Sequence, residues 1–300
     1  MNNLLLFVSF LTGLSVGSFL NCLIYRLHKG ESFWKGRSYC PKCKHKLGIL
    51  DLIPVFSFIF LRGKCRYCHQ KISWQYPLVE LCTAILFTLA YLKTPVDYSQ
   101  INSQIFANQF VYLFHSQIFA NSFVWFPQIF AYQFVYLWFF ISVLLFIFIY
   151  DLKYYLIPDK IILPAIIITL IFNIISPYSL VLRNWFSLNY LNYLFYPISY
   201  SNFSYPNILN LLLAAAIGGG FFLVQFLISK GRWVGGGDIR LGILMGLILG
   251  WPAIFLSLFL AYIIGAIIGI GLIVTGKKGW QSQVPFGPFL AGATIVVLLL

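Results

Sequence analysis

Long apolar runs recur along this chain and constrain its fold more than any other feature. A bilayer core about 30 Å thick is crossed by roughly 20 helical residues, and about eight runs approach or reach that length. The chain is 60% hydrophobic and only 9% charged, which is outside the range of soluble globular proteins. The sequence therefore predicts an all-α integral membrane protein with about eight transmembrane helices. The predicted spans are 3–24, 77–93, 134–150, 156–176, 208–229, 239–250, 252–274 and 287–300.

Positive charge is concentrated in the polar segment between the first two predicted spans. Eleven of the twenty Lys and Arg residues lie between Arg26 and Lys71, together with only two acidic residues. The positive-inside rule places this segment in the cytoplasm. Threading the spans alternately from there leaves only Lys93 and Arg183 outside among the basic residues. The net charge of +13 is thus explained by membrane topology, and we expect no nucleic-acid partner. The first span has no basic n-region and no cleavage site, so we expect it to be retained.

The same polar segment contains two C-x-x-C pairs separated by 21 residues, a spacing close to that of zinc ribbons. Four thiolates satisfy a tetrahedral Zn²⁺, and a domain this small has little core, so the metal would supply much of its folding free energy. Disulfides or a redox pair are the alternatives, which a cytoplasmic location disfavours. We predict a small zinc-ribbon-like domain at 25–76 with structural zinc. Its ligands are Cys40, Cys43, Cys65 and Cys68.

Other features of the chain have simpler explanations. Cys22 and Cys82 fall in apolar helices and are expected to be buried packing residues. Polar, aromatic-rich stretches near 97–133 and 177–207 are expected to be external insertions, and the first contains three Gln-Ile-Phe-Ala copies at unequal intervals, unlike a solenoid. The predicted domains are a first transmembrane helix (1–24), the cysteine domain (25–76) and a polytopic membrane domain (77–300).

Two of the seven acidic residues, Asp151 and Asp238, lie where apolar runs meet basic residues. Ionisable groups at a membrane boundary cost free energy unless they are solvated, paired or used. The threading makes no use of the acids, yet it places both aspartates at the cytoplasmic ends of their helices, where they can meet. Asp238 closes a run that begins at Gly235, and glycines let another segment or an extended peptide come close.

Two neighbouring aspartates share a proton, so one can act as base on a water and the other as acid. This is the chemistry of aspartic proteases, which needs neither a metal nor a covalent intermediate. Each residue also has a structural explanation. Asp151 can pair with Lys153 or Lys160, whereas Asp238 can pair with Arg240 or cap the following helix. Joint placement on one side of the membrane favours catalysis.

Beyond these residues, the chain resembles the type IV prepilin peptidase (leader peptidase) family, which are bacterial inner-membrane aspartic proteases of the GxGD type. The resemblance rests on motifs that occur in order from end to end. They are GLSVGSFLN (13–21) with YRL (25–27), the two cysteine pairs, DLIPV (51–55), YPLVEL (76–81), Asp151 with IPD (157–159), GGGD (235–238) and VPFGPFL (284–290).

The resemblance implies that Asp151 and Asp238 are the catalytic pair. It also implies cleavage of the basic leader of prepilins and pseudopilins at the cytoplasmic face of the bacterial inner membrane. Many family members N-methylate the exposed residue with S-adenosylmethionine, and the cysteine domain is associated with that bifunctional form. The chain has no GxGxxG-like signature, so the prediction that S-adenosylmethionine is the methyl donor rests on the resemblance alone. Two departures are Lys153, where the family often has a second acid, and Gly236, where a bulkier residue is common.

The expected partners are prepilin-like substrates and membrane lipid. A basic leader is not complemented by a basic protein, so we expect the substrate helix to lie between spans and its unwound cleavage site to enter near the glycine run. Glu80, at the start of the second span, could bind a substrate cation or form a structural salt bridge. Asp159, after Pro158, is expected to be a turn or N-cap residue. The candidate substrate-binding residues are Gly235, Gly236, Gly237 and Glu80.

Three alternatives stay open at this point. One is a GxGD intramembrane protease with another class of substrate, which the cysteine domain argues against. Another is a transporter that binds a cation or proton with the two aspartates, but such acids are expected near mid-bilayer in broken helices. The last is a non-enzymatic zinc-bearing assembly factor, in which Asp→Asn changes at both positions would be silent.

Overall fold

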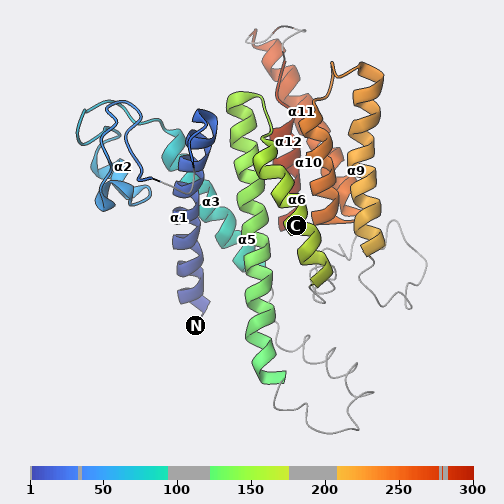
Figure 1. Ribbon diagram of the computed structural model, residues 1–300, viewed down its shortest axis with the longest axis horizontal. Helices are drawn as coiled ribbons and strands as arrows, with labels where there is room; N and C mark the ends of the chain where they lie inside the picture. The colour runs from blue at the N-terminus through green and yellow to red at the C-terminus, as the bar shows by residue number, and fades with distance from the viewer. Residues whose placement is uncertain (1, 33–35, 94–121, 176–207, 277–278, 280–282) are drawn as a thin grey trace. The chain divides into compact units, whose positions relative to one another are not determined.

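The computed structural model describes residues 2–32, 36–93, 122–175, 208–276, 279 and 283–300 (Figure 1). Within these ranges the regular structure is helical and no strand is formed, apart from two isolated bridges in the cysteine domain. The insertion predicted near 177–207 and the first two Gln-Ile-Phe-Ala copies lie outside the described residues. The third copy, at 128–131, lies in a helix.

Each of the predicted spans corresponds to a helix, which confirms the all-α prediction for the described part of the chain. Five helices, α1, α3, α5, α9 and α11, are long and apolar enough to cross a membrane. The protein is therefore a multi-pass membrane protein, while the count of about eight spans stays a prediction. The helices are α1 (Asn2–Lys29), α3 (Gln75–Lys93), α5 (Ser122–Tyr154), α6 (Asp159–Ile175), α9 (Ile208–Ser229), α10 (Gly236–Leu249), α11 (Ala253–Val274) and α12 (Gly287–Leu299).

The chain forms two compact units, Met1–Ile141 and Ser142–Leu300, which divide within α5. In the first unit α1 packs along α3, because glycines on α1 let the backbones touch. A Cβ at Gly13 would lie 2.5 Å from the Ala84 Cα, and one at Gly17 would lie 2.7 Å from the Glu80 Cα. The polar segment between these helices contains two short elements, η1 (Ile49–Leu52) and α2 (Phe56–Phe60).

The isolated cysteines correct one expectation of burial. Cys82 is exposed on the surface of α3, and Cys22 is only half-buried, with its Sγ 4.0 Å from the Ser38 Oγ. The prediction was wrong for Cys82 because a membrane helix presents apolar side chains to lipid as readily as to protein. An apolar neighbourhood in the sequence therefore does not show which face of such a helix is packed.

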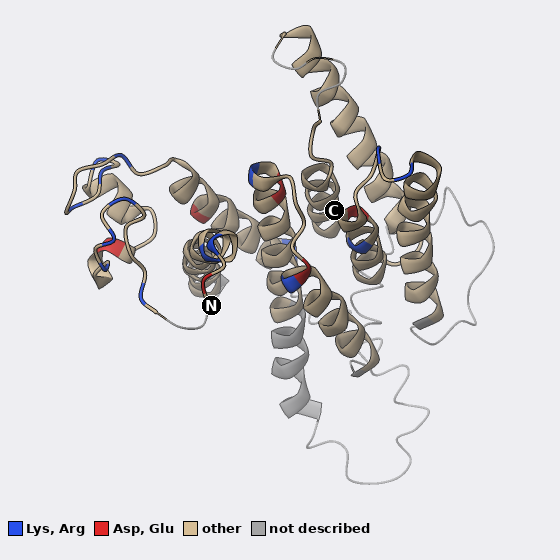
Figure 2. Cartoon of the chain, turned by 45° about the horizontal axis from the view of Figure 1, so that its top comes forward, with Lys and Arg blue, Asp and Glu red and all other residues tan. Residues whose placement is uncertain are grey.

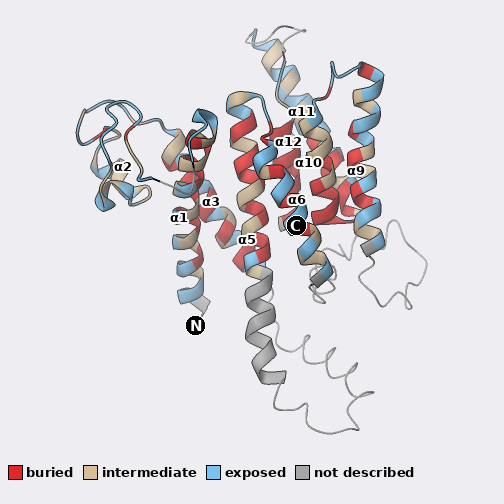
Figure 3. Cartoon of the chain, in the orientation of Figure 1, coloured by how far each residue is buried: buried red, intermediate tan, exposed pale blue. Residues whose placement is uncertain are grey.

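In the second unit α10 packs mainly against α9, α6 and α12. Its contact with α9 is close, since a Cβ at Gly246 would lie 2.3 Å from the Ala214 carbonyl oxygen. Figure 3 shows α10 and α12 largely buried, whereas α9 and α11 expose many side chains. On α11, for example, the side chain of Phe259 is 63% exposed. A buried helix thus begins just before Asp238, and its neighbours fix the position of its first turn.

Candidate active site and cysteine site

The four cysteine thiols of the polar segment converge. Their Sγ atoms all lie within 4.8 Å of one another, and those of Cys40 and Cys68 are 4.0 Å apart. A tetrahedral zinc with bonds of about 2.3 Å holds its sulfurs roughly 3.8 Å apart. The cluster therefore fits a divalent metal such as zinc with only a small contraction.

Each C-x-x-C pair lies in a knuckle with the same backbone hydrogen bonds. In the first, the Cys40 N–H donates to the His45 carbonyl and the Lys44 N–H to the Cys40 carbonyl, both at 2.9 Å. Lys44 takes a left-handed conformation with φ 61°. The equivalent residues 25 positions later repeat this pattern, with the same 2.9 Å distances: Cys65, Gln70 and His69. Local backbone geometry thus presents each pair of thiols to the other.

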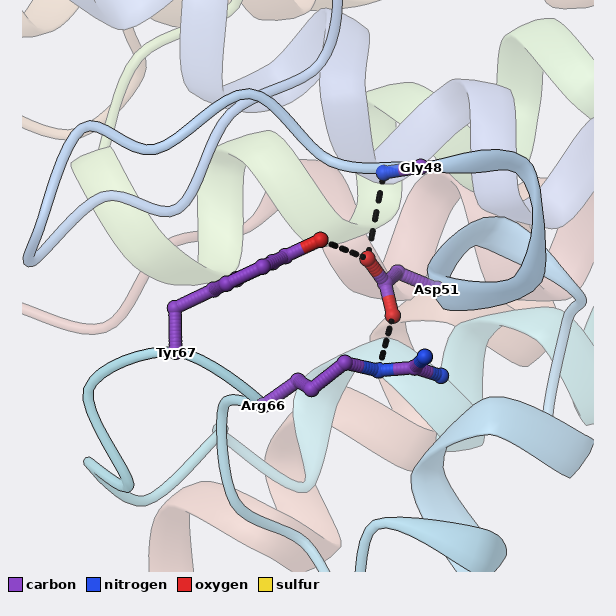
Figure 4. Close-up of polar contacts among 4 residues, drawn as sticks. All are labelled: Gly48, Asp51, Arg66 and Tyr67. Carbon is purple, nitrogen blue, oxygen red and sulfur yellow. Dashed lines mark hydrogen bonds and ion pairs between the residues drawn. The ribbon is translucent and has the colours of Figure 1, made fainter.

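Asp51 ties the linker between the knuckles to the second knuckle (Figure 4). One carboxylate oxygen lies 2.9 Å from the Arg66 Nε, and the other accepts hydrogen bonds of 3.1 Å from the Gly48 N–H and the Tyr67 hydroxyl. Arg66 and Tyr67 are the two residues between Cys65 and Cys68. The hydrogen bond to Asp51 raises the pKa of the Tyr67 hydroxyl. Asp51 is therefore placed to hold the knuckle in shape.

Glu80 has a structural contact. Its side chain is buried on α3 and its carboxylate accepts a 2.7 Å hydrogen bond from the Val55 N–H. Val55 has φ 61°, a conformation that β-branched residues rarely adopt. Glu80 therefore fixes a strained turn after Pro54 to the membrane helix, and its binding to a substrate cation stays a prediction.

Asp151 lies in the last turn of α5 and is only 5% exposed. Its carboxylate accepts a hydrogen bond from the backbone N–H of Gly287, the first residue of α12. A Cβ at Gly287 would lie 2.5 Å from the Asp151 Oδ2, so any side chain there would displace the carboxylate. Glycine at this position lets the backbone of α12 approach Asp151 directly.

Asp238 lies at the start of α10, outside the five candidate spans. Its Oδ2 accepts a 3.1 Å hydrogen bond from the Gly235 N–H, so it caps the helix, as the structural explanation expected. Burial raises the pKa of Asp238 to about 6, although the bond from Gly235 opposes the rise. The Asp238 carboxylate lies near enough to Asp151 for its charge to disfavour ionisation of Asp151. The two aspartates are thus brought together at one place in the second unit.

Two basic residues close to the aspartates in sequence, Arg240 and Lys153, have contacts with other side chains. Arg240 forms an ion pair with Asp159, which begins α6, so of the two structural alternatives for Asp238 the structure has the helix cap and not the pair with Arg240. Lys153 lies with its Nζ 5.3 Å from the centre of the Tyr154 ring. Figure 2 shows the charged residues of the second unit near helix ends, with uncharged helix bodies between them.

The three glycines before Asp238 differ in their surroundings. A Cβ at Gly237 would lie 2.9 Å from the Cβ of Ile157, so this position has no room for a side chain. A Cβ added at Gly236 would meet no neighbouring segment within 4 Å, and one added at Gly235 would first meet the Asp238 carboxylate, at 3.7 Å. Gly237 therefore serves packing, whereas Gly235 and Gly236 border open space beside the aspartate.

Sequence reasoning did not assign three residues near the pair. Gly287 lies in the VPFGPFL motif, so the resemblance contained a signal for it. Ile157 precedes Pro158 in the IPD motif and is buried. Tyr262 interacts electrostatically with Asp238 and hydrogen bonds to Gln225 at 2.9 Å. A tyrosine in an apolar helix gives no sequence signal for this placement.

Two family models match the chain and cover both sites. The Bacterial Peptidase A24 N-terminal domain matches residues 11–94, which include all four clustered cysteines. The Type IV leader peptidase family matches residues 138–270, which include both aspartates. The chain belongs to the type IV leader peptidase family. The resemblance inferred from the ordered motifs is thereby confirmed.

Relatives of this family are similar over nearly the whole chain. The prepilin leader peptidase/N-methyltransferase of Bacillus subtilis (strain 168) is 29% identical over 98% of this chain and 94% of its own length. That of Aeromonas salmonicida (strain A449) is 26% identical over 97% of this chain and 89% of its own length. The protein of the same name from Myxococcus xanthus (strain DK1622) matches a shorter region. It is 49% identical over 26% of this chain and 23% of its own length. No solved structure matches the chain.

Proposed function

We propose that the protein is a membrane aspartic endopeptidase that removes the basic leader of type IV prepilins and pseudopilins, with Asp151 and Asp238 as its catalytic pair. Peptidase and methyltransferase activity on prepilins follow from the family and agree with the names of the relatives. The observation that supports the residue assignment is the convergence of two carboxylates from the end of α5 and the start of α10.

The chemistry follows from the interaction of the two charges. Because ionisation of one carboxyl disfavours ionisation of the other, the two carboxyls lose their protons in separate steps, and between these steps the pair shares one proton. The ionised member removes a proton from a water, which attacks the peptide carbonyl, while the protonated member polarises that carbonyl. The proton then passes to the leaving amine. Hydrogen bonds from the Gly287 and Gly235 N–H groups hold the two carboxylates in place during these steps.

The substrate reaches the pair as an extended segment. Open space beside Gly235 and Gly236 supports entry of the unwound cleavage site there, next to Asp238. Gly237 contributes by packing, and Glu80 remains a proposed partner for a substrate cation. A substrate helix that lies among the spans would bring its leader to the basic side of the membrane.

We place the active site at the cytoplasmic face of the bacterial inner membrane. The concentration of basic residues between Arg26 and Lys71 supports this orientation. Both aspartates lie at helix ends, whereas the transporter alternative predicted acids within broken helices near mid-bilayer. The arrangement supports a protease that acts at the membrane boundary.

The four cysteines are proposed to hold a structural Zn²⁺. Four thiolate ligands leave no coordination position for a substrate, so the metal would fold the domain and not take part in catalysis. Methylation of the new N-terminal residue is proposed to use S-adenosylmethionine. That cofactor rests on the family and on the methyltransferase names of the relatives.

A cleavage assay with the full chain in detergent tests the proposal. Wild type should shorten a prepilin, while Asp151→Asn and Asp238→Asn should each lose about 10³-fold or more in cleavage rate, since neither variant keeps two carboxyls that can share a proton. Glu31→Gln is a matched control, because it removes one exposed carboxylate in the other unit. Cleavage retained by either aspartate variant contradicts the proposed mechanism. Methyl transfer to an already cleaved pilin, measured separately, should persist in both.

A further inference from the structure

The helices that carry the two aspartates, α5 and α10, make little direct contact with each other in the described residues. α10 packs mainly against α9, α6 and α12, and α5 is not among its main partners in the described residues. The connection from α5 to α6, residues 155–159, starts directly after the helix that bears Asp151. This short connection also reaches the first turn of α10, as two contacts show.

The first contact is apolar and passes through Ile157. This side chain is 7% exposed and lies against Gly237, which directly precedes Asp238. Its Cδ1 would be 3.3 Å from a Cβ at Gly287, the residue whose N–H bonds to Asp151. Ile157 therefore touches the backbone next to each of the two carboxylates.

The second contact is the ion pair between Asp159 and Arg240. Asp159 ends the connection and begins α6, whereas Arg240 lies two residues after Asp238 on α10. Both side chains are partly exposed, at 53% and 40%. Such a pair contributes little to overall stability because water screens it. Its position across the two segments points to a geometric role.

We propose that the 155–159 connection sets the distance between the catalytic carboxylates, with Ile157 as an apolar spacer and the Asp159–Arg240 pair as a clasp. A shared proton and one attacking water require the two groups to be held within about 0.5 Å of the productive geometry. These are positioning residues, since they touch neither the water nor the peptide. The inference rests on the proposed catalytic pair.

A double-mutant cycle on kcat and KM tests the clasp in the full chain. Asp159→Asn and Arg240→Gln should each lower kcat by about 10- to 100-fold, because a small displacement of reacting groups is costly. KM should stay within about twofold, since substrate binding is not altered. The double variant should be no slower than the slower single variant. Arg240→Lys should recover most of the rate, and Arg232→Gln, an exposed charge change in the preceding loop, should have no effect.

Several outcomes overturn the clasp. Unchanged kcat in the single variants, or losses that multiply in the double variant, shows that the two residues do not act together on the pair. A rise in KM with unchanged kcat shows a role in substrate binding. Rate losses that follow a lowered unfolding midpoint show a purely structural role. Asp238→Asn, measured in parallel, separates the two proposals: if it is active, the catalytic pair fails, whereas active clasp variants beside an inactive Asp238→Asn remove only the positioning role.

Ile157→Val tests the spacer with little risk to folding. The change removes the Ile157 Cδ1 atom, which lies 3.3 Å from an added Cβ at either Gly287 or Gly237, and keeps the Ile157 Cβ, which lies 2.9 Å from the one at Gly237. We expect kcat to fall a few-fold, about 3- to 10-fold, with an unchanged KM. Ile167→Val is the matched control, because it makes the same chemical change at an exposed position of α6. Equal kcat for Ile157→Val and wild type overturns the spacer.

Discussion

In the first unit, two knuckles with the same local backbone each supply two thiols to the cysteine cluster, whereas in the second unit two single aspartates, 87 positions apart in the sequence, come close enough for their charges to interact. The cysteine site depends on short segments that a metal can draw together. The aspartate pair depends on glycines that let α10 and α12 approach their neighbours. Local spacing therefore defines the first site, and tertiary packing defines the second.

The two sites should accordingly fail in different ways. A metal site with little core around it gains its folding free energy from ligation, so the loss of one ligand affects the whole domain. The aspartate pair lies in a unit with buried helices, so a local change should alter its chemistry and leave the fold in place.

The largest effect is expected for Cys65→Ser. Structural zinc contributes about 10–16 kcal/mol of apparent binding free energy in small zinc domains, and three thiolates would retain only part of it. We expect loss of bound zinc, measured by elemental analysis, and rapid proteolysis between residues 36 and 74. Cleavage of the prepilin leader should persist because the aspartates lie in the other unit.

Cys82→Ser is the matched control, since this thiol is exposed on α3 and outside the cluster. It should keep full zinc content. Simultaneous loss of zinc and of leader cleavage in Cys65→Ser would contradict the independence of the two sites, because it would show that the aspartate pair depends on the cysteine domain.

The same contrast explains what the sequence could predict. C-x-x-C spacing is local, so the clustering of the four cysteines was predicted without knowledge of the fold. Asp151 and Asp238 were found through charge threading and family resemblance, which locate helix ends but not side-chain partners. Pairing of Arg240 with Asp238 was one of two structural alternatives that the sequence left open for Asp238, and only tertiary structure shows that Arg240 pairs with Asp159.

The packing contacts around the two aspartates were the feature of the site least predictable from the sequence. Gly287 and Ile157 act through backbone approach between segments far apart in the chain, and their residue types are common in apolar sequence. Cys82 is a further example, since the sequence of an apolar membrane helix does not indicate which face packs against protein and which faces lipid. Sites that depend on such contacts can be recognised only from the three-dimensional structure.

An intermediate effect is expected for Gly287→Ala. The added Cβ would lie 2.5 Å from the Asp151 Oδ2, so the carboxylate must move away from its hydrogen-bond donor. We expect the rate of leader cleavage to fall by about 100-fold, with zinc content unchanged. Gly220→Ala, on α9, is the control because no heavy atom lies within 4 Å of its added Cβ. Equal rates for the two variants would show that close approach of α12 is not needed by the pair.

The smallest effect is expected for Asp51→Asn. Three donors, the Gly48 N–H, the Tyr67 hydroxyl and the Arg66 Nε, converge on the two carboxylate oxygens. An amide offers only one acceptor oxygen and turns an NH₂ toward the remaining donors, so the second knuckle loses part of its support. By analogy with other outer-shell partners, zinc affinity should fall about 10- to 100-fold, measured by competition with a chromogenic chelator. Glu31→Gln, the control in the same unit, should bind zinc as tightly as wild type because its amide oxygen can still accept the Tyr39 hydroxyl. If the two variants bind zinc equally well, the knuckles hold their shape through backbone geometry alone, and the cysteine site is even more local than the comparison assumes.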